Sequence, residues 1–279
     1  MMITYPNAKI NLGLNVVSKR PDGYHNLETV FYPIPLCDTL SLEALAPEQQ
    51  NTTDYLFNIE GTPVDCVPEK NLVIKAFRLL QSEYPLAPVQ IRMRKDIPFG
   101  AGLGGGSSDA AFMLKMLNDH FSLGLSVGKL EELAARLGAD CAFFIQNRPT
   151  LAEGIGNIFT PISLSLKGYT LVLIKPEIHI STQEAYAKVR PHMPEHRVQD
   201  AICRPIEEWK DIIVNDFEES VFPNHPELNR IKQELYRQGA IYASMSGSGS
   251  SIYGIFPTEP KNMAELFHPH FYWQTKLEI

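Results

Sequence analysis

The residues best suited to chemistry form a glycine-rich stretch, residues 98–109, with the sequence PFGAGLGGGSSD. Five of the seven positions from Gly100 to Gly106 are glycine, and glycine allows positive φ and a close approach of backbone to a ligand. Residues 89–95 alternate apolar and polar before it, which predicts a half-buried strand. An apolar stripe at helical spacing follows, with Ser107 or Ser108 as the expected N-cap and Asp109 in the first turn. A strand, a bare loop and a helix N-terminus in this order indicate a phosphate site.

Three known phosphate-binding patterns compete for this loop. The Walker-type loop requires a lysine after its last glycine, but Ser107 follows Gly106. The spacing Gly100-x-Gly102-x-x-Gly105 matches the dinucleotide fingerprint, yet a second helical pattern follows where that fold needs a parallel strand and an acid. The third pattern, which these residues resemble, is the loop of the small-molecule kinases named after galactose, homoserine, mevalonate and phosphomevalonate. A glycine-rich turn without a ligand is the structural alternative.

The composition is that of an ordinary soluble protein with one large or two medium domains. The net charge of −7 argues against a nucleic-acid partner. The N-terminus lacks the apolar segment of a secretion signal, and no apolar run is long enough to cross a membrane, so we expect a cytoplasmic protein without a membrane partner. The cysteines lie far apart, which predicts reduced thiols rather than a zinc site or a disulfide framework: Cys37, Cys66, Cys141 and Cys203.

Helical and strand patterns are mixed without regular alternation, so the sequence predicts an α+β fold. We place a domain boundary between residues 163 and 164, which gives domains 1–163 and 164–279. Strands are expected at residues 9–16, 27–34, 39–42, 55–59, 89–95, 150–162 (with a turn), 169–174 and 273–277. Helices are expected at residues 71–84, from 110 onward, after Ser126 as far as Gly138, and at 184–189, 209–221, 226–238 and 262–267.

Two charged residues and a second loop allow more than one interpretation. Asp140 precedes four apolar residues, and spacing alone favours a helix N-cap over a functional carboxylate in a dry place. Lys9 lies on the polar face of an alternating strand, where it is either a solvated lysine or a functional one. Residues 244–251 form a second run of serine and glycine between two apolar strands. A hairpin turn or a phosphate-binding loop has this composition.

Four ordered segments together resemble the 4-diphosphocytidyl-2-C-methyl-D-erythritol kinase family of that small-molecule kinase superfamily. They are residues 6–12 with 20–25, residues 100–110, residues 138–140 and residues 244–251. The resemblance implies an N-terminal domain like ribosomal protein S5, a C-terminal ferredoxin-like domain and an active site between them. It also implies ATP and Mg²⁺ as cofactors, and a cytidine diphosphate derivative as the substrate, phosphorylated on its tertiary 2-hydroxyl.

The resemblance also assigns residues to roles. Asp140 is implied as the catalytic base and Lys9 as its charge partner. Tyr24 and Tyr186 are implied to sandwich the cytosine ring, with tyrosine at 186 where many members have phenylalanine, and His25 to read its edge. The residues implied at ATP are Pro98, Phe99, Gly100, Ala101, Gly102, Leu103, Gly104, Gly105, Gly106, Ser107 and Ser108, with Ser108 near Mg²⁺ and with Asn71 and Lys95 at the adenosine. Further substrate candidates are Asn11, Phe31 and Thr182, although Phe31 in its apolar strand suits a core role equally well. Residues 246–249 are expected near the phosphates.

Other functions remain as alternatives to this interpretation. A homoserine-type or mevalonate-type kinase would share the fold, and the set Tyr24, His25 and Tyr186 argues against it. A nucleotide-dependent oxidoreductase and a catalytically silent nucleotide-binding regulator come from other classes. A monomer and a homodimer are equally compatible with the sequence.

Overall fold

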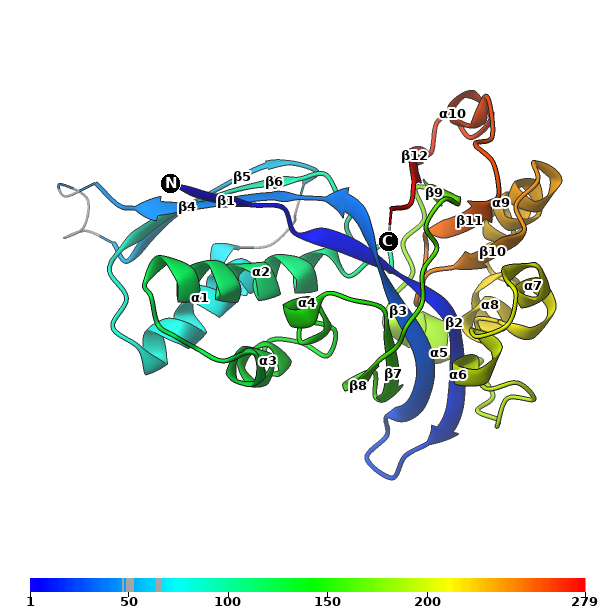
Figure 1. Ribbon diagram of the computed structural model, residues 1–279, viewed down its shortest axis with the longest axis horizontal. Coiled ribbons are helices and arrows are strands. Elements are labelled where there is room, and N and C mark those ends of the chain that lie inside the picture. The colour runs from blue at the N-terminus through cyan, green and yellow to red at the C-terminus, as the bar shows by residue number, and fades with distance from the viewer. Residues whose placement is uncertain (47, 49–52, 64–66, 279) are drawn as a thin grey trace. The chain divides into compact units, whose positions relative to one another are not determined.

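The computed structural model describes residues 1–46, 48, 53–63 and 67–278 (Figure 1). The described chain divides into two compact units that alternate along the sequence. The first unit comprises Met1–Ala8, Leu36–Phe99 and Gly104–Asn147, and the second comprises Lys9–Pro35, Gly100–Leu103 and Arg148–Ile279. The expected boundary between residues 163 and 164 stays a prediction. Of the cysteines, Cys66 lies outside the described residues, and Cys37, Cys141 and Cys203 are free thiols.

The first unit is a four-stranded sheet with helices on one face (Figure 1). Its order is β1 (Met2–Thr4), β4 (Thr39–Ala44), β6 (Val89–Lys95) and β5 (Tyr55–Gly61), antiparallel except for the β5–β6 pair. Val89, Ile91 and Met93 alternate inward on β6, which gives the helices an apolar surface to cover. The helices of this unit are η1 (Pro68–Lys70), α1 (Leu72–Glu83), α2 (Gly105–His120), α3 (Val127–Ala135) and α4 (Phe143–Gln146).

The helix ends of the first unit test the predicted caps. Ser126 caps α3 as predicted, since its side chain accepts a hydrogen bond from the Lys129 N–H. The prediction that Ser107 or Ser108 caps α2 is wrong. Gly104 holds that position with a φ of 70°, a left-handed conformation that starts the helix before the serines. Asp109 consequently lies beyond the first turn and is buried.

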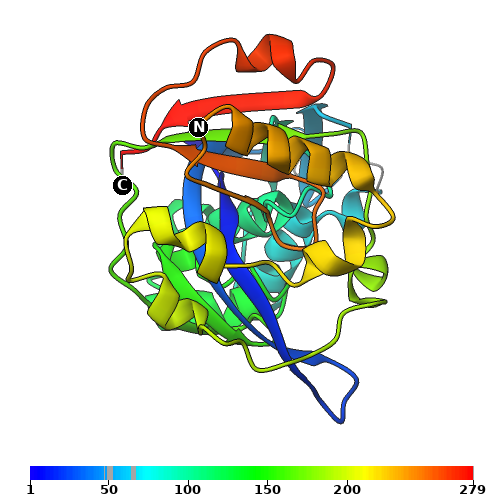
Figure 2. The ribbon, with the colours of Figure 1, turned by 90° about the vertical axis from the view of Figure 1, so that its right-hand side faces the viewer.

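The second unit contains two four-stranded sheets. One has the order β2 (Asn7–Lys19), β3 (His25–Cys37), β7 (Thr150–Gly154) and β8 (Ile158–Pro161). The other has the order β10 (Tyr242–Met245), β11 (Ile252–Phe256), β9 (Thr170–Lys175) and β12 (Phe271–Lys276), and all of its pairs are antiparallel. Helix α9 (Pro226–Arg237) lies across β10 and β11 (Figure 2) and buries Leu228, Ile231 and Leu235 in their shared core. The other helices are α5 (Thr182–Tyr186), α6 (Val198–Ala201), η2 (Ile206–Glu208), α7 (Trp209–Ile212), α8 (Phe217–Val221) and α10 (Met263–Leu266).

The prediction of one long helix over residues 209–221, in the second unit, is wrong. Residues 209–221 form two short helices, α7 and α8, separated by an extended segment. The Leu14 N–H donates to Val214 O over 2.8 Å, and the Asp216 N–H donates to Leu14 O over 2.8 Å. These residues thereby pair with the edge of β2, and backbone groups bonded to a strand are not available to a helix. Helix α5 likewise differs from the predicted 184–189, because it begins at Thr182 and ends at Tyr186.

The α+β class is confirmed by the mixture of helices and sheets in both units. The remaining predicted strands are found within a few residues of their expected positions. Across the residues that the structure describes, no helix combines the length and the apolar character needed to traverse a bilayer.

Candidate active site

Lys9 and Asn11 project from β2 toward the glycine-rich stretch within the second unit. The Lys9 ammonium donates to Asn11 Oδ1 over 2.5 Å and to Gly102 O over 3.1 Å, and it lies 4.7 Å from the centre of the Phe31 ring. The Lys9 residue is only 3% exposed, so the interpretation as a solvated lysine is wrong. A buried ammonium is costly without acceptors and a compensating environment. The strand therefore holds this charge in a defined place, with Asn11 and Phe31 beside it.

The second small-residue loop, residues 246–249, packs against the glycine-rich stretch. Ser246 Oγ accepts from the Asn11 N–H over 3.2 Å and donates to Gly102 O over 2.9 Å. Gly102 has a φ of +74°, and a Cβ there would lie 2.0 Å from Ser246 O. No other residue type fits this position without moving the backbone. The second unit thus brings together parts of three sequence motifs that lie far apart along the chain.

The start of α2 supplies the other part of the glycine-rich stretch, in the first unit. The first N–H groups of a helix have no acceptor within it and favour an anion. Ser107 is half-buried, whereas Ser108 is fully buried and its Oγ has no hydrogen-bond partner among the described residues. Burial raises the pKa of the Cys141 thiol to about 11, and its hydrogen bond with Ser107 partly opposes that rise. The Ser107–Cys141 contact ties the start of α2 to the turn that carries Asp140.

Asp140 lies in a turn before α4 and is half-exposed. The predicted N-cap role is wrong, because Ala142 occupies the cap position of α4 and makes no side-chain cap bond. Helix α4, which follows this turn, is tied to α2 by Lys115. The Lys115 ammonium donates to Phe144 O over 3.1 Å and lies 3.7 Å from the centre of the Phe112 ring. Burial lowers the pKa of Lys115 to about 8.

Two residues expected near adenosine have structural partners in the first unit. The Asn71 side chain caps α1 by accepting from the Val73 N–H over 2.9 Å. The Lys95 ammonium is buried between two carboxylates and donates to Asp109 Oδ2 over 2.7 Å and to Asp38 Oδ2. Asp38 Oδ1 in turn accepts the N–H groups of Asp96 and Ile97. The adenosine contacts of Asn71 and Lys95 stay predictions.

Burial of this ion cluster, Asp38, Lys95 and Asp109, changes its protonation. Burial raises the pKa of Asp109 to about 8, against the opposing effect of the Lys95 ammonium and with the help of the neighbouring Asp38 charge. Burial lowers the pKa of Lys95, but the two carboxylates outweigh it and the net shift is upward. Around neutral pH the ammonium therefore keeps its charge, and the proton on Asp109 relieves repulsion between the two acids.

The residues expected at cytosine are only partly brought together. The rings of His25 and Tyr186 stack with centroids 4.8 Å apart and planes 23° apart, and Tyr186 meets Phe217 edge to face over 4.8 Å. Tyr24 lies beside His25 at the turn between β2 and β3 and is 61% exposed. Thr182 is the exposed first residue of α5.

The segment that joins α7 to α8 contains polar residues that the sequence analysis did not identify. Asn215 Nδ2 donates to Met245 O and to Gly247 O, each over 2.8 Å. Glu218 Oε1 accepts the Met245 N–H over 2.8 Å and the Ser244 hydroxyl over 3.1 Å. The one signal in the sequence was an asparagine–aspartate pair after the apolar residues 212–214. The sequence pattern places that pair inside the predicted helix 209–221, so it gave no indication of a contact with the loop.

In the described part of the chain, no group of three or more acidic, histidine or cysteine side chains is arranged to hold a metal ion. Mg²⁺ in nucleotide sites is held largely by phosphate oxygens and water, with one or two protein ligands. The hydroxyls of Ser107 and Ser108 at the start of α2 fit that kind of site, since Ser108 Oγ is an unpartnered polar atom.

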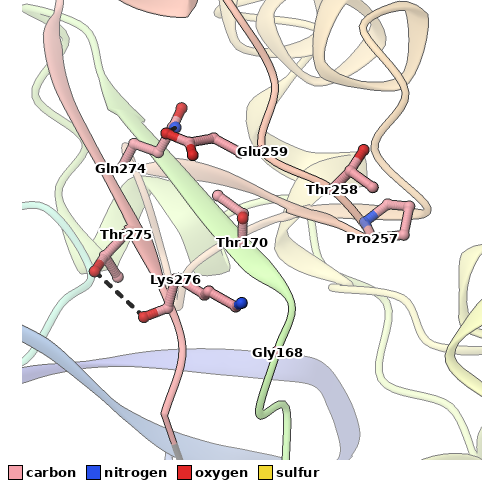
Figure 3. A pocket seen from close by; sticks show the side chains of 8 residues that line it. All are labelled: Gly168, Thr170, Pro257, Thr258, Glu259, Gln274, Thr275 and Lys276. Atoms are coloured by element: carbon pink, nitrogen blue, oxygen red, sulfur yellow. Dashed lines mark hydrogen bonds between the residues drawn. The ribbon is translucent and has the colours of Figure 1, made fainter.

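A separate pocket of about 430 Å³ lies at one end of the sheet β10–β11–β9–β12, where β9 begins and β11 and β12 end (Figure 3). Thr170, Glu259, Gln274 and Lys276 line it, and Gln274 Nε2 donates to Glu259 Oε1 over 3.0 Å. Residues 246–249 leave the opposite end of the same sheet, beyond the Met245–Ile252 pair. The pocket is therefore not part of the cluster around Gly102.

Comparison with known proteins identifies the family. The family models described as GHMP kinases N terminal domain and GHMP kinases C terminal match residues 71–148 and 199–266. A Bacteroides fragilis protein named 4-diphosphocytidyl-2-C-methyl-D-erythritol kinase is 57% identical over 277 residues, which cover 99% of this chain and 100% of that protein. A Bacteroides thetaiotaomicron protein of the same name is 61% identical over 260 residues, covering 92% and 93%.

Solved structures agree with these relatives. A crystal structure of 4-(cytidine 5'-diphospho)-2C-methyl-D-erythritol kinase superposes with a TM-score of 0.80 at 31% identity and covers 98% of both chains. A mevalonate kinase shares the fold, with a TM-score of 0.73 at 13% identity over 100% of both chains. The two-domain small-molecule kinase fold and an ATP-dependent kinase activity are thereby confirmed. The chain belongs to the 4-diphosphocytidyl-2-C-methyl-D-erythritol kinases, within the GHMP kinase family.

Proposed function

We propose that this kinase transfers the γ-phosphate of ATP to the 2-hydroxyl of 4-diphosphocytidyl-2-C-methyl-D-erythritol, in the cytoplasm, as a step of isoprenoid precursor synthesis. The names of its relatives support the substrate. The observation that carries the proposal is the contact of Lys9 and Ser246 with Gly102 in the second unit. These contacts join the N-terminal segment, residues 6–12, to the glycine-rich stretch and to residues 246–249.

We propose Asp140 as the base and Lys9 as its charge partner. The tertiary C2 oxygen forms a bond to the γ-phosphorus, the bond from that phosphorus to the bridging oxygen breaks, and ADP leaves. The hydroxyl proton passes to the Asp140 carboxylate. A hindered tertiary alcohol gains much from correct orientation, so positioning by Asp140 matters as well as proton transfer. A lysine near the reacting groups offsets the charge on the transferring phosphoryl group.

We propose that the glycine-rich stretch, residues 98–108, and residues 246–249 bind the ATP phosphates. The bare N–H groups at the start of α2 suit a phosphate, and the helix dipole favours one there. Bound Mg²⁺ would neutralise phosphate charge during transfer. Ser108 is the candidate ligand that the resemblance implies, because its Oγ has no hydrogen-bond partner among the described residues, whereas Ser107 bonds to Cys141.

We propose that Tyr24 and Tyr186 sandwich the cytosine ring and that His25, whose ring lies beside that of Tyr186, reads the edge of the base. Aromatic rings stack on a base at little conformational cost, and the imidazole offers a hydrogen bond to its edge. Asn11, Phe31 and Thr182 are further substrate contacts in this proposal. The position of Phe31 beside the Lys9 ammonium supports a functional role over a purely core role.

The test measures ADP release from Mg·ATP with the diphosphocytidyl alcohol, homoserine or mevalonate as acceptor. We expect turnover with the first acceptor alone. Turnover with homoserine or mevalonate instead would refute the substrate assignment, and ATP binding without ADP release from any acceptor would favour a regulator. Asp140→Asn should lower kcat by about 10²- to 10⁴-fold, the usual contribution of a general base. Asp119→Asn on the exposed face of α2 is the matched control and should keep wild-type turnover. Wild-type turnover by Asp140→Asn would disprove the base assignment.

A further inference from the structure

We infer that Asn215 and Glu218 are positioning residues that fix the backbone of residues 246–249 so that the Ser248 N–H is presented to the ATP phosphates. The inference rests on the proposed phosphate-binding role of this loop. Neither residue belongs to a sequence motif that we assigned to the site. Both lie in the second unit with the loop that they contact.

Asn215 is built to hold two carbonyl groups at once. Asn215 is 2% exposed, and its amide Nδ2 donates to Met245 O and Gly247 O over 2.8 Å each. Its Oδ1 accepts the Phe217 N–H over 3.0 Å, so both donors and the acceptor of this side chain are engaged. The segment itself is fixed to β2 through Leu14. The Asn215 amide is therefore held in one orientation and is not a mobile surface group.

The Gly247 carbonyl and the Ser248 N–H belong to one peptide group. In a planar trans peptide these two groups point in opposite directions. Holding Gly247 O toward Asn215 consequently turns the Ser248 N–H away from Asn215. Within the described chain, the N–H groups of Gly247 and Ser248 have no hydrogen-bond acceptor. A fixed N–H without a protein partner is suited to an anionic ligand.

Glu218 holds the same loop at its beginning. Its carboxylate accepts the Met245 N–H and the Ser244 hydroxyl, and its other oxygen pairs with the Lys232 ammonium over 2.5 Å. Met245 is thus held through its N–H by Glu218 and through its carbonyl by Asn215. At the next residue, Ser246 Oγ bonds to Gly102 O, next to the Lys9 contact. The two side chains therefore set the path of the loop where it meets the glycine-rich stretch.

The test compares Asn215→Asp with wild type. Aspartate has nearly the same shape, but its carboxylate cannot donate and would face two carbonyl oxygens. We expect the Kd for a non-hydrolysable ATP analogue with Mg²⁺, measured by calorimetry, to rise about tenfold, the cost of losing buried hydrogen bonds. The KM for ATP should rise by a similar factor, while the KM for the diphosphocytidyl substrate should stay within about twofold of wild type. A structural defect alone would lower the active fraction and leave both KM values unchanged.

Glu218 provides a second pair of variants in case Asn215→Asp does not fold. Glu218→Gln keeps an oxygen that can accept from Met245, so it should retain most of the affinity for the ATP analogue. Glu218→Ala removes that acceptor and should weaken binding. Ile231→Ala, a core truncation on α9, controls for lost stability and should lower the Tm without changing the Kd.

Two results would overturn the inference: an unchanged Kd for the ATP analogue in folded Asn215→Asp, or equal losses in Glu218→Gln and Glu218→Ala. Failure of the wild-type enzyme to phosphorylate the diphosphocytidyl substrate would refute the proposed function instead. The binding comparison would still decide the role of Asn215, because it does not depend on turnover.

Discussion

The ion cluster of Asp38, Lys95 and Asp109 makes a quantitative prediction for Asp109→Asn. Asparagine is neutral at every pH and resembles the protonated form of the acid. We expect the wild type to lose stability relative to the variant as the pH rises from about 4 to about 8, so the variant's advantage should be larger near pH 9 than near pH 6. The cluster ties β6 to α2, the helix that begins in the glycine-rich stretch, so its protonation affects how firmly that helix is held.

The magnitude follows from the two pKa values of Asp109, about 8 in the folded protein and 3.8 as the reference for the unfolded chain. A carboxyl with a raised pKa holds its proton more tightly when folded, so the free energy of unfolding falls as the pH rises between those two values. Each pH unit in that interval is worth about 1.4 kcal/mol. From about pH 6 to about pH 9 the wild type should lose about 2 to 3 kcal/mol relative to the variant, since the loss ends once the folded state also ionises.

Urea unfolding at four pH values from about 6 to 9 measures this difference directly. Other titrating groups contribute to both proteins and cancel in the comparison. Asp200→Asn, at an exposed acid on α6, is the control and should give a curve parallel to that of the wild type. If the curve of Asp109→Asn were also parallel to that of the wild type, Asp109 would not hold the proton in the folded state and the account of the cluster would be wrong.

Two further predictions concern other contacts of the site. Gly102→Ala should destabilise the protein by about 1–3 kcal/mol in urea unfolding and raise the KM for ATP, because a Cβ there meets Ser246 O at positive φ. Gly128→Ala, which meets no atom within 4 Å on α3, should be neutral or slightly stabilising, and equal effects of the two would contradict the packing argument. Burial lowers the pKa of Lys115 to about 8, so the unfolded chain binds the extra proton between about pH 8 and 10 and the wild type should gain stability there relative to Lys115→Met. A difference that does not change with pH would show that the Lys115 ammonium is not desolvated.

Local patterns were sufficient to predict most elements of the fold. The alternation that predicts β6 and the proline and glycine that bound α9 are decided within a few residues, and both elements formed as expected. The predictions failed where a distant partner decides the conformation. Residues 213–216 leave the helical pattern because β2 offers them hydrogen bonds, and that strand is about 200 positions away.

The candidate site shows the same limit. The spacing of the motifs identified the glycine-rich stretch and Lys9, and the resemblance to a family supplied their roles. Neither reveals that Lys95 is enclosed by two acids, since Asp38 is 57 residues away in sequence. Nor does either predict Asn215, whose importance lies in two carbonyl groups that it meets only after folding.

The interleaving of the two units limits how this enzyme can be dissected. A fragment that stops at Asn147 would keep β2 and β3 but lose β7, the antiparallel neighbour of β3. A fragment that starts at Arg148 would lack Lys9–Pro35 and Gly100–Leu103, which its compact unit needs. The chain passes from one unit to the other at five points, so truncation offers no route to an isolated nucleotide-binding or substrate-binding half. Dissection of its activity must proceed by point substitution in the intact chain.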